Sequence, residues 1–422
     1  MQTSQGRLSA SSSEKILAGL ARQSGVSDVL LHHVAVEEAY AGSPLVVGNR
    51  VDLLRDGDQA YPAMEKELGL ARRSIDLEVY TFRDDEVGKR FAQLLQERAR
   101  HGVDVRVMYD SVGCLSTDRE FFDSLRSAGV AVIEFNPVNP LTARGRWRLE
   151  HRDHRKLLVV DGRVAFTGGI NISTEYAGSG RSSSSGGGRV PVEGKAWRDT
   201  QVRIEGPVVS DFARLFDDSW RKQEGPPPRR SHPSSPPPPA GSDIVRAIGS
   251  TPDDAESIIH KTLLSAISHA ERSVHLTQMY FVPDPDLVRL VEADARRGLD
   301  VRIILPSEGF WMTRYAGRSH FSELLRAGVH VYERRGPLLH AKTAVIDGVW
   351  STVGSANLDY RSFAKNDEVN AVVLGEDFGD QLEAMFRDDI AESQEITAAR
   401  WKRRGPSTRF KEIVARLWER ML

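Results

Sequence analysis

Two segments of the sequence carry the same reactive side chains at identical spacing. In each, a histidine is followed by a lysine two residues on, an aspartate five residues later and an asparagine ten residues after that. The members are His154, Lys156, Asp161 and Asn171 in the first segment and His340, Lys342, Asp347 and Asn357 in the second. A random chain of this composition contains one such pattern on the order of once in ten thousand tries, so two copies indicate a functional constellation.

The spacing places the reactive groups together. Residues i and i+2 of a strand point to the same face, so His154 emerges beside Lys156 and His340 beside Lys342. Gly-Gly or Gly-Ser before each asparagine suits a close backbone approach that brings the amide beside the pair. We expect the two halves to meet about a pseudo-twofold axis, so that one pocket holds two imidazoles, two ammonium groups and two amides.

Such a pocket suits a tetrahedral anion. Lysine and asparagine would hold the non-bridging oxygens and stabilise charge in the transition state. One histidine would attack phosphorus while the other protonates the departing oxygen. Lysines so close together would repel a cation, so the sequence predicts no metal ion, and it indicates no cofactor.

The elements that must position these residues also occur twice. Residues 74–109 and 273–305 each read as a strand, a turn with acidic residues, an amphipathic helix and a second strand. The endings RARHGVDVRV and DARRGLDVRI are typical of a βαβ unit. We therefore predict an α/β fold of two homologous α-β-α lobes, packed about a pseudo-twofold axis with the active site between them.

Composition divides the chain further. The segment GPPPRRSHPSSPPPPAGS is too rich in proline for helix or sheet, which predicts an exposed, semi-rigid linker. A low-complexity insert at 178–194 is expected to form a mobile loop in the first half. The expected segments are an amino-terminal arm with a helix (1–45), the first lobe (46–224), the linker (225–242), the second lobe (243–390) and a basic tail (391–422).

The overall composition excludes several classes of protein. The 57 Lys+Arg residues nearly balance the 59 Asp+Glu residues, which argues against a general nucleic-acid binder. A single cysteine, Cys114, rules out an internal disulfide framework and a cysteine-rich metal site. The amino end does not read as a secretory signal, and no stretch approaches the roughly 18 apolar residues of a spanning helix.

The duplicated motif resembles that of the phospholipase D superfamily, over nearly the whole of residues 46–390. This resemblance implies that His154 is the nucleophile and forms a phosphohistidine, and that His340 acts as general acid and then base. It implies phosphate binding by Lys156, Lys342, Asn171 and Asn357. Asp161 and Asp347 match the motif aspartates, and we expect them to support the fold around the site more than to transfer protons.

Two further carboxylates follow from the same resemblance. A nucleophilic histidine needs an acceptor for its other ring nitrogen, because that contact sets the tautomer. The segment NDEVNAVV is similar to the family segment that supplies this carboxylate, which gives Glu368. The matching segment of the first half is WRDT, which gives Asp199. The alternative for each is a solvated carboxylate on a strand.

The sequence also resembles the bacterial cardiolipin synthases of the short kind, which lack the paired amino-terminal spanning helices of longer relatives. Matching segments include HRKLLVVDGRVAFTGGINIS and HAKTAVIDGVWSTVGSANLDYRSF. The resemblance implies phospholipid transphosphatidylation, with phosphatidylglycerol as donor and acceptor and cardiolipin and glycerol as products. A hydrolytic phospholipase D and a nucleic-acid phosphodiesterase are the alternatives, and the net charge of -2 disfavours the latter.

The tail has the pattern of an amphipathic helix. Residues 400–422 hold eight basic and two acidic side chains, as an interfacial anchor on anionic lipid requires. We therefore expect a peripheral protein on the cytoplasmic face of the bacterial inner membrane. The alternative is a helix packed on the body with its basic face in water. The apolar positions are Phe410, Ile413, Val414, Leu417, Trp418 and Met421.

Overall fold

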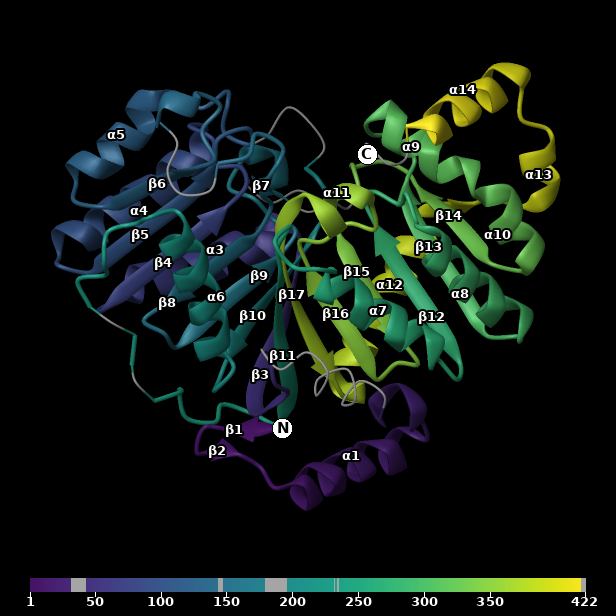
Figure 1. Ribbon diagram of the computed structural model, residues 1–422, viewed down its shortest axis with the longest axis horizontal. Helices are drawn as coiled ribbons and strands as arrows, with labels where there is room; N and C mark the ends of the chain where they lie inside the picture. The colour runs from purple at the N-terminus through teal and green to yellow at the C-terminus, as the bar shows by residue number, and fades with distance from the viewer. Residues whose placement is uncertain (32–42, 143–146, 179–195, 231, 234, 419–422) are drawn as a thin grey trace, which may run out of the picture.

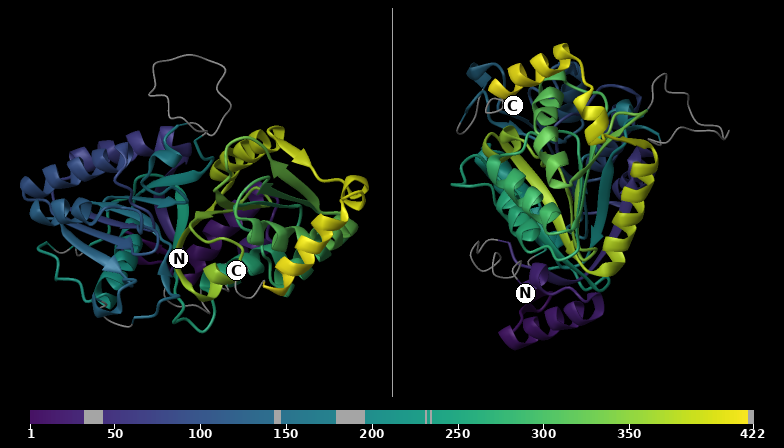
Figure 2. Two further views of the ribbon diagram at one scale, coloured as in Figure 1. Left: turned by 90° about the horizontal axis from the view of Figure 1, so that it is seen from above. Right: turned by 90° about the vertical axis from the view of Figure 1, so that its right-hand side faces the viewer.

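The two motifs lie in two lobes that stand side by side (Figure 1; Figure 2). The computed structural model describes residues 1–31, 43–142, 147–178, 196–230, 232–233 and 235–418. The view from the front and the view from above both separate the blue and teal first lobe from the green and yellow second lobe. Each lobe is built on one β-sheet with helices on both faces, as predicted.

The sheet of the first lobe has the strand order β3-β10-β9-β8-β4-β5-β6. Strands β4, β5 and β6 are parallel to one another, and the other neighbours are antiparallel. The strands are β3 (Val46–Arg55), β4 (Ser74–Val79), β5 (Asp104–Asp110), β6 (Ala131–Phe135), β8 (Lys156–Val160), β9 (Val164–Gly168) and β10 (Thr200–Glu205).

The sheet of the second lobe repeats this order as β11-β17-β16-β15-β12-β13-β14 and adds β18 at its edge. The matching order confirms the duplication inferred from the sequence. The strands are β11 (Asp243–Ser250), β12 (Ser273–Gln278), β13 (Asp300–Pro306), β14 (His330–Arg334), β15 (Lys342–Ile346), β16 (Trp350–Gly354), β17 (Asn366–Leu374) and β18 (Ser393–Glu395).

The predicted βαβ units are present in both lobes. Helix α4 (Glu86–Arg100) connects β4 to β5, and α8 (Pro285–Arg296) connects β12 to β13. Both helices begin at an aspartate whose carboxylate accepts a backbone N–H of the first turn. Asp85 accepts from Gly88 at 3.0 Å and Asp284 from Leu287 at 2.8 Å. These caps satisfy amide groups that a helix start otherwise leaves unpaired.

Alternate residues of the motif strands pack into different hydrophobic cores. Each sheet therefore lies between two layers of helices. In β8, Leu158 packs with α3, α4 and α5, whereas Leu157 packs with α6. In β15, Ala344 packs with α7, α8 and α10, whereas Val345 faces α12. The helices are α3 (Asp56–Leu70), α5 (Arg119–Ser127), α6 (Val209–Lys222), α7 (Ile258–Ser268), α10 (Phe321–Ala327) and α12 (Glu376–Ala391).

The lobes join through strands and through a shared core. β3 pairs antiparallel with β11, with Val47 opposite Ile244. The core that contains α6 and α12 draws apolar side chains from both lobes, including Val159 of β8 and Val345 of β15. The lobes therefore form one continuous structure, in which strand pairing across the junction fixes how the two motifs face each other.

The terminal segments attach mainly to the second lobe. Helix α1 (Ala10–Ser24) lies at the lower end of the molecule, and Leu17 packs into the core of the second lobe (Figure 1). Ser27 and Asp28 donate their backbone N–H groups to Glu271 at 2.8 Å. The short amino-terminal strands β1 (Gln2–Thr3) and β2 (Gly6–Arg7) pair with each other, and β1 also pairs with β3.

The proline-rich segment runs along the first lobe and is largely exposed. Its described part is held by Trp220, which donates to the Pro226 carbonyl at 2.8 Å, and by His232, which lies 3.0 Å from Asp76. The 178–194 insert lies outside the described residues, except for Gly178. The remaining elements are β7 (Arg152–Asp153), α9 (Trp311–Ser319), α11 (Tyr360–Ala364), α13 (Ala398–Lys402), α14 (Pro406–Leu417) and the 3-10 turns η1 (Pro140–Thr142) and η2 (Thr174–Tyr176).

Candidate active site

Each motif histidine is attached by its backbone to the opposite lobe. β7 of the first lobe pairs parallel with the start of β17, and the His154 N–H donates to the Asp367 carbonyl at 2.9 Å. Arg198 of the first lobe bridges to Leu339, and the His340 N–H donates to the Arg198 carbonyl at 2.7 Å. The two connections match each other, so they place both histidines at the junction of the lobes.

The two candidate carboxylates also cross between the lobes. Both carboxylate oxygens of Glu368 lie 3.0 Å from Nδ1 of His154. Asp199 accepts from Nδ1 of His340 at 2.6 Å. Each carboxylate comes directly after the residue that accepts the histidine backbone N–H, so one short parallel pairing positions both contacts. A proton held on Nδ1 leaves Nε2 of each ring as the nucleophile or base.

Burial sets the protonation states of these groups. Loss of solvent, together with the nearby lysines, outweighs the attraction of the carboxylates and lowers the pKa of His154 to about 4 and that of His340 to about 3. The carboxylates of Glu368 and Asp199 have lowered pKa values because each faces a histidine and a lysine. Both rings are therefore neutral near pH 7, as a histidine nucleophile requires.

The lysines lie against the histidines and are also buried. Nζ of Lys156 donates to the His154 carbonyl at 2.6 Å and lies 5.1 Å from the ring centre of Tyr80. Nζ of Lys342 contacts the His340 carbonyl and lies 2.9 Å from Nδ1 of the His340 ring. Burial lowers the pKa of Lys156 to about 7 and that of Lys342 to about 8, so a bound anion would stabilise the charged form of both lysines.

The two asparagines differ in their contacts. The side-chain oxygen of Asn171 accepts from the Thr81 N–H at 3.0 Å, and its NH₂ group donates to the Tyr176 hydroxyl at 2.8 Å. Asn357 is equally buried, but its side-chain oxygen has no hydrogen-bond partner among the described residues. A phosphate contact from Asn171 would therefore use the one N–H of its side chain that does not donate to Tyr176. The side-chain amide of Asn357 is held by fewer hydrogen bonds, because its oxygen has no partner among the described residues.

The motif aspartates lie at the far ends of the strands. Asp161 accepts backbone N–H groups of Arg72, Arg73 and Ser74, and Asp347 accepts those of residues 271–273. Each follows its motif lysine by five residues, which is about 16 Å along a strand. This position matches a supporting role and is too distant for proton transfer at the histidines.

Comparison with known proteins identifies the family. The family described as "Cardiolipin synthase, PLD-like domain" matches residues 64–179 and 263–390. A cardiolipin synthase of Geobacillus sp. (strain WCH70) is 35% identical over 384 residues, which cover 90% of this chain and 74% of that protein. The chain belongs to the cardiolipin synthase family of phospholipase D-like proteins. It is accordingly a phospholipase D-type phosphatidyltransferase.

Other relatives agree with this assignment. A probable cardiolipin synthase of Bacillus subtilis is 32% identical over 376 residues, which cover 89% of this chain and 72% of that protein. The crystal structure of a phosphatidylserine synthase from Haemophilus influenzae aligns with a TM-score of 0.69 at 12% identity and covers 93% of this chain and 100% of that one. This structural match confirms the two-lobed phospholipase D fold.

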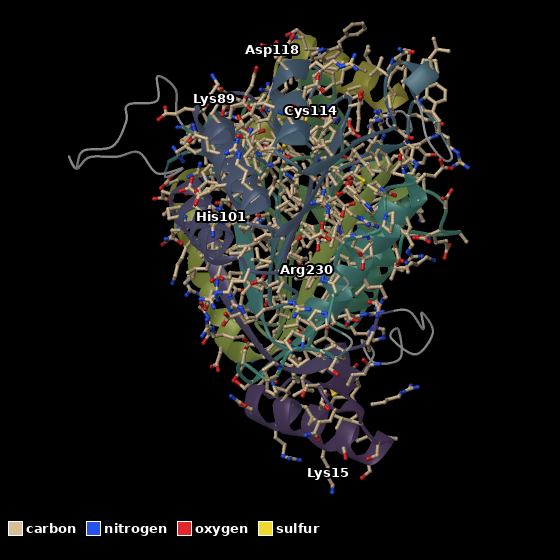
Figure 3. The ribbon with its side chains drawn as sticks, turned by 90° about the vertical axis from the view of Figure 1, so that its left-hand side faces the viewer. Lys15, Lys89, His101, Cys114, Asp118 and Arg230 are labelled. Atoms are coloured by element: carbon tan, nitrogen blue, oxygen red, sulfur yellow. The ribbon has the colours of Figure 1, made fainter. Side chains whose placement is uncertain are left out.

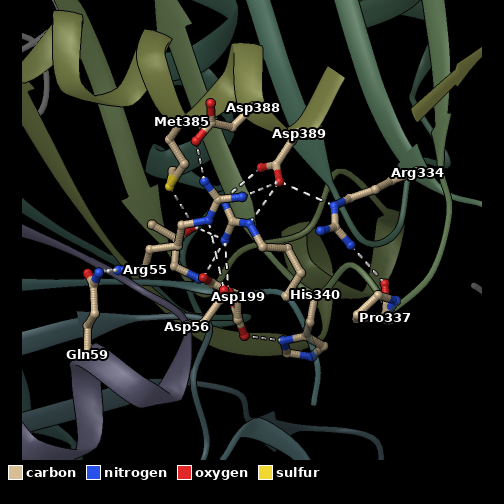
Figure 4. A network of polar contacts seen from close by, with 12 residues as sticks. Arg55, Asp56, Gln59, Asp199, Arg334, Pro337, His340, Met385, Asp388 and Asp389 are labelled. Atoms are coloured by element: carbon tan, nitrogen blue, oxygen red, sulfur yellow. Dashed lines mark hydrogen bonds and ion pairs between the residues drawn. The ribbon is translucent and has the colours of Figure 1, made fainter. Parts of the chain in front are cut away.

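The sequence did not indicate the buried network of ion pairs and hydrogen bonds that supports Asp199 (Figure 4). Arg198 is fully buried and binds both oxygens of Asp389, at 3.0 and 2.7 Å. Arg55 and Arg334 also reach Asp389, each at 3.2 Å. One buried carboxylate thus holds three guanidinium groups, of which one belongs to the residue directly before Asp199.

Asp56 completes this network from the backbone side. Its carboxylate accepts the Asp199 N–H at 2.9 Å, and its own N–H donates to the Asp199 carbonyl at 3.0 Å. Asp56 has a φ of 60°, a left-handed conformation that non-glycine residues seldom adopt. The surrounding contacts must compensate for this strain, which suggests that the position of Asp199 is strictly determined.

The Glu368 side has a different support. The hydroxyl of Ser355 donates to Glu368 at 2.5 Å, and the Asn366 amide lies 3.4 Å from it. Arg155 donates to the Glu368 carbonyl at 3.1 Å and to the Ser219 hydroxyl at 2.5 Å. Ser355 belongs to the Gly-Ser-x-Asn motif, so its role was accessible from the sequence, whereas that of Arg155 was not.

Aromatic rings enclose both histidines. Tyr80 meets the ring of His154 edge-on at 5.0 Å, and Tyr176 and Trp197 lie 5.4 and 5.3 Å from the ring of His340. These rings contribute to the burial that keeps the imidazoles neutral. Within the part of the chain that the structure describes, no group of acidic, histidine and cysteine residues could hold a metal ion.

Proposed function

We propose that this phosphatidyltransferase makes cardiolipin from two molecules of phosphatidylglycerol through a phosphohistidine on His154. The observation that carries the proposal is the crossed clamp, in which Glu368 holds Nδ1 of His154 and Asp199 holds Nδ1 of His340. Each clamp leaves Nε2 to react, and the lysines beside the two rings supply positive charge for the phosphoryl oxygens. The relatives are cardiolipin synthases, which supplies the substrate class.

The first step would form the covalent intermediate. Nε2 of His154 attacks phosphorus, and the bond from phosphorus to the headgroup glycerol oxygen breaks. The departing oxygen takes a proton from His340, whose charged form the phosphodiester anion and Asp199 stabilise. The products of this step are glycerol and phosphatidyl-His154.

The second step would regenerate the enzyme. The headgroup hydroxyl of another phosphatidylglycerol gives its proton to His340 and attacks phosphorus, and the bond to His154 breaks. The sum is two phosphatidylglycerol molecules converted to one cardiolipin and one glycerol. Water in place of the lipid hydroxyl would release phosphatidic acid.

Helix α14 supports attachment to the surface of an anionic membrane. Glu412 and Ala415 are buried on the side of α14 that packs on α9, whereas Phe410, Ile413 and Leu417 are exposed. The apolar face of this helix is therefore presented to solvent, and Met421 lies outside the described residues. None of the described helices is long and apolar enough to span a membrane. We infer peripheral binding through this face, on the bacterial inner membrane.

Product analysis by mass spectrometry tests the proposed reaction. Purified protein would receive phosphatidylglycerol vesicles, with the His154→Ala variant as the blank. We expect cardiolipin and glycerol in equal amounts from the wild type alone. Phosphatidic acid as the sole product would make the protein a hydrolase, and cleavage of DNA without a change in lipid would make it a nuclease.

A further inference from the structure

Exposed large apolar side chains are distributed unevenly over the molecule. Twelve of the fourteen in the described part of the chain lie at one edge, and the exceptions are Leu31 and Leu70. We call the twelve the apolar rim. They are Val112, Leu115, Val138, Leu141 and Leu149 in the first lobe and Phe310, Trp311, Tyr360, Phe410, Ile413, Leu417 and Trp418 in the second.

The rim lies at the edge of the sheets that carries the candidate active site. Val79 at the end of β4 is paired with Lys156, so the motif lies at the carboxyl ends of the parallel strands. The chain leaves β5 and β6 at this same edge, and the following loops carry Leu115 and Leu141. Leu70 instead ends α3 shortly before β4 begins, which is the opposite edge.

The second lobe extends the rim across the same end of the molecule. Phe310 and Trp311 follow β13, Tyr360 begins α11, and α14 packs on α9. In Figure 1, α9, α11 and α14 lie along the top, level with β7 and α5 and opposite α1. Figure 3 shows Cys114 and Asp118, which flank the Leu115 loop, at this end and Lys15 of α1 at the other.

Charge favours an anionic occupant for this surface. Residues 398–418 carry seven basic side chains and one acidic side chain, Glu412. That carboxylate is buried and lies 3.0 Å from Arg404, so it does not offset the remaining basic groups at the surface. A rim of apolar side chains beside a basic helix matches the surface of a bilayer that contains anionic lipid.

We propose that the apolar rim of both lobes is a membrane-docking surface that seats the opening of the active site on an anionic phospholipid bilayer. This inference rests on the proposed function and extends it, because the tail then acts together with loops of the first lobe. A phosphatidylglycerol molecule would reach His154 and His340 with its acyl chains still in the bilayer. Transfer of those chains into water, which is strongly unfavourable, would not be needed.

A pair of double variants tests the docking surface. Leu115→Asn/Leu141→Asn removes two rim leucines, and Leu31→Asn/Leu70→Asn removes the two exposed leucines elsewhere. All four side chains are more than half exposed, so neither variant disturbs the core. Binding to vesicles of phosphatidylglycerol and phosphatidylcholine would be measured by co-sedimentation. We expect the dissociation constant to rise about tenfold for the rim variant and to change less than twofold for the control.

Activity on two forms of substrate separates docking from chemistry. The rim variant should lose activity on phosphatidylglycerol in vesicles in proportion to its binding, yet keep wild-type activity on short-chain phosphatidylglycerol below its critical micelle concentration. High salt should weaken wild-type binding through the basic tail and leave the tenfold difference between the variants.

Two results would overturn the docking surface. One is vesicle binding of the rim variant equal to that of the wild type. The other is a change of oligomeric state in gel filtration without a change in vesicle binding, which would make the rim an interface between copies of this chain. A wild type that makes no cardiolipin would refute the proposed function, while the binding comparison would still decide the role of the rim.

Discussion

The two halves of the candidate active site carry the same motif but are supported in different ways. His154 is held by both oxygens of Glu368, which a serine and an asparagine also contact. His340 is held by one oxygen of Asp199, whose position depends on a buried network of arginines and aspartates. Duplication therefore preserved the motif side chains, while the groups behind them diverged.

This difference is consistent with different tasks for the two histidines. A nucleophile must be fixed in direction, and the bidentate contact with Glu368 restricts rotation of the ring. An acid and base must change its protonation state in each cycle, and the single short contact to Asp199 stabilises the charged form when it appears.

Replacement of either histidine should abolish cardiolipin synthesis, by about 10⁴-fold or more. The two variants should differ on a phosphatidyl ester of p-nitrophenol, because nitrophenolate departs without a proton. His340→Ala should give a burst of nitrophenolate that stops after one turnover, and His154→Ala should give none. Rapid-quench absorbance would detect the burst. A burst from His154→Ala instead would exchange the two roles.

Removal of charge from either clamp should lower kcat by about 10² to 10⁴ with little change in KM. Glu368→Gln should suppress the nitrophenolate burst because it acts on His154, whereas Asp199→Asn should keep the burst and lose later turnovers. Asp380→Asn, on the exposed side of α12, is the control. If both variants slowed the same step equally, Glu368 and Asp199 would not act on separate steps through His154 and His340, and this prediction would be wrong.

Asp389→Asn should lower kcat about tenfold and also reduce stability. Three buried or partly buried arginines would lose a shared partner, and the loss of one member of a buried ion pair costs about 3–5 kcal/mol. The adjacent Asp388→Asn is the control, since Asp388 is exposed and pairs with Arg55 at 2.8 Å. A changed pH profile of kcat would show that Asp389 positions Asp199. A loss of stability with an unchanged profile would restrict Asp389 to a structural role.

The buried neutral histidines should make stability depend on pH. The pKa of His154 is lowered to about 4 and that of His340 to about 3, so between those values and about 6.5 the unfolded chain binds more protons. The free energy of unfolding should fall as pH falls through this window, by about 1.4 kcal/mol per pH unit for each histidine. Urea unfolding at several pH values would measure the slope, and His154→Gln/His340→Gln should flatten it.

Much of the fold and of the candidate site could be predicted from the sequence. The βαβ units, the duplicated lobes and the histidine–lysine pairs follow from periodicity and spacing, which act over a few residues. Glu368 and Asp199 were found because their segments resemble those of the family. The same reasoning placed Asp161 and Asp347 in the motif, but only the structure shows that they cap the opposite ends of the strands.

Local sequence shows which groups could react, because side-chain chemistry and strand alternation are local properties. Long-range folding establishes which carboxylate meets which histidine, since Glu368 is 214 residues from His154 and Asp199 is 141 residues from His340. Long-range folding also brings Arg198 to Asp389 and leaves the apolar face of α14 exposed. These contacts depend on the antiparallel pairing of β3 with β11 and on the core shared by both lobes, which no local pattern encodes.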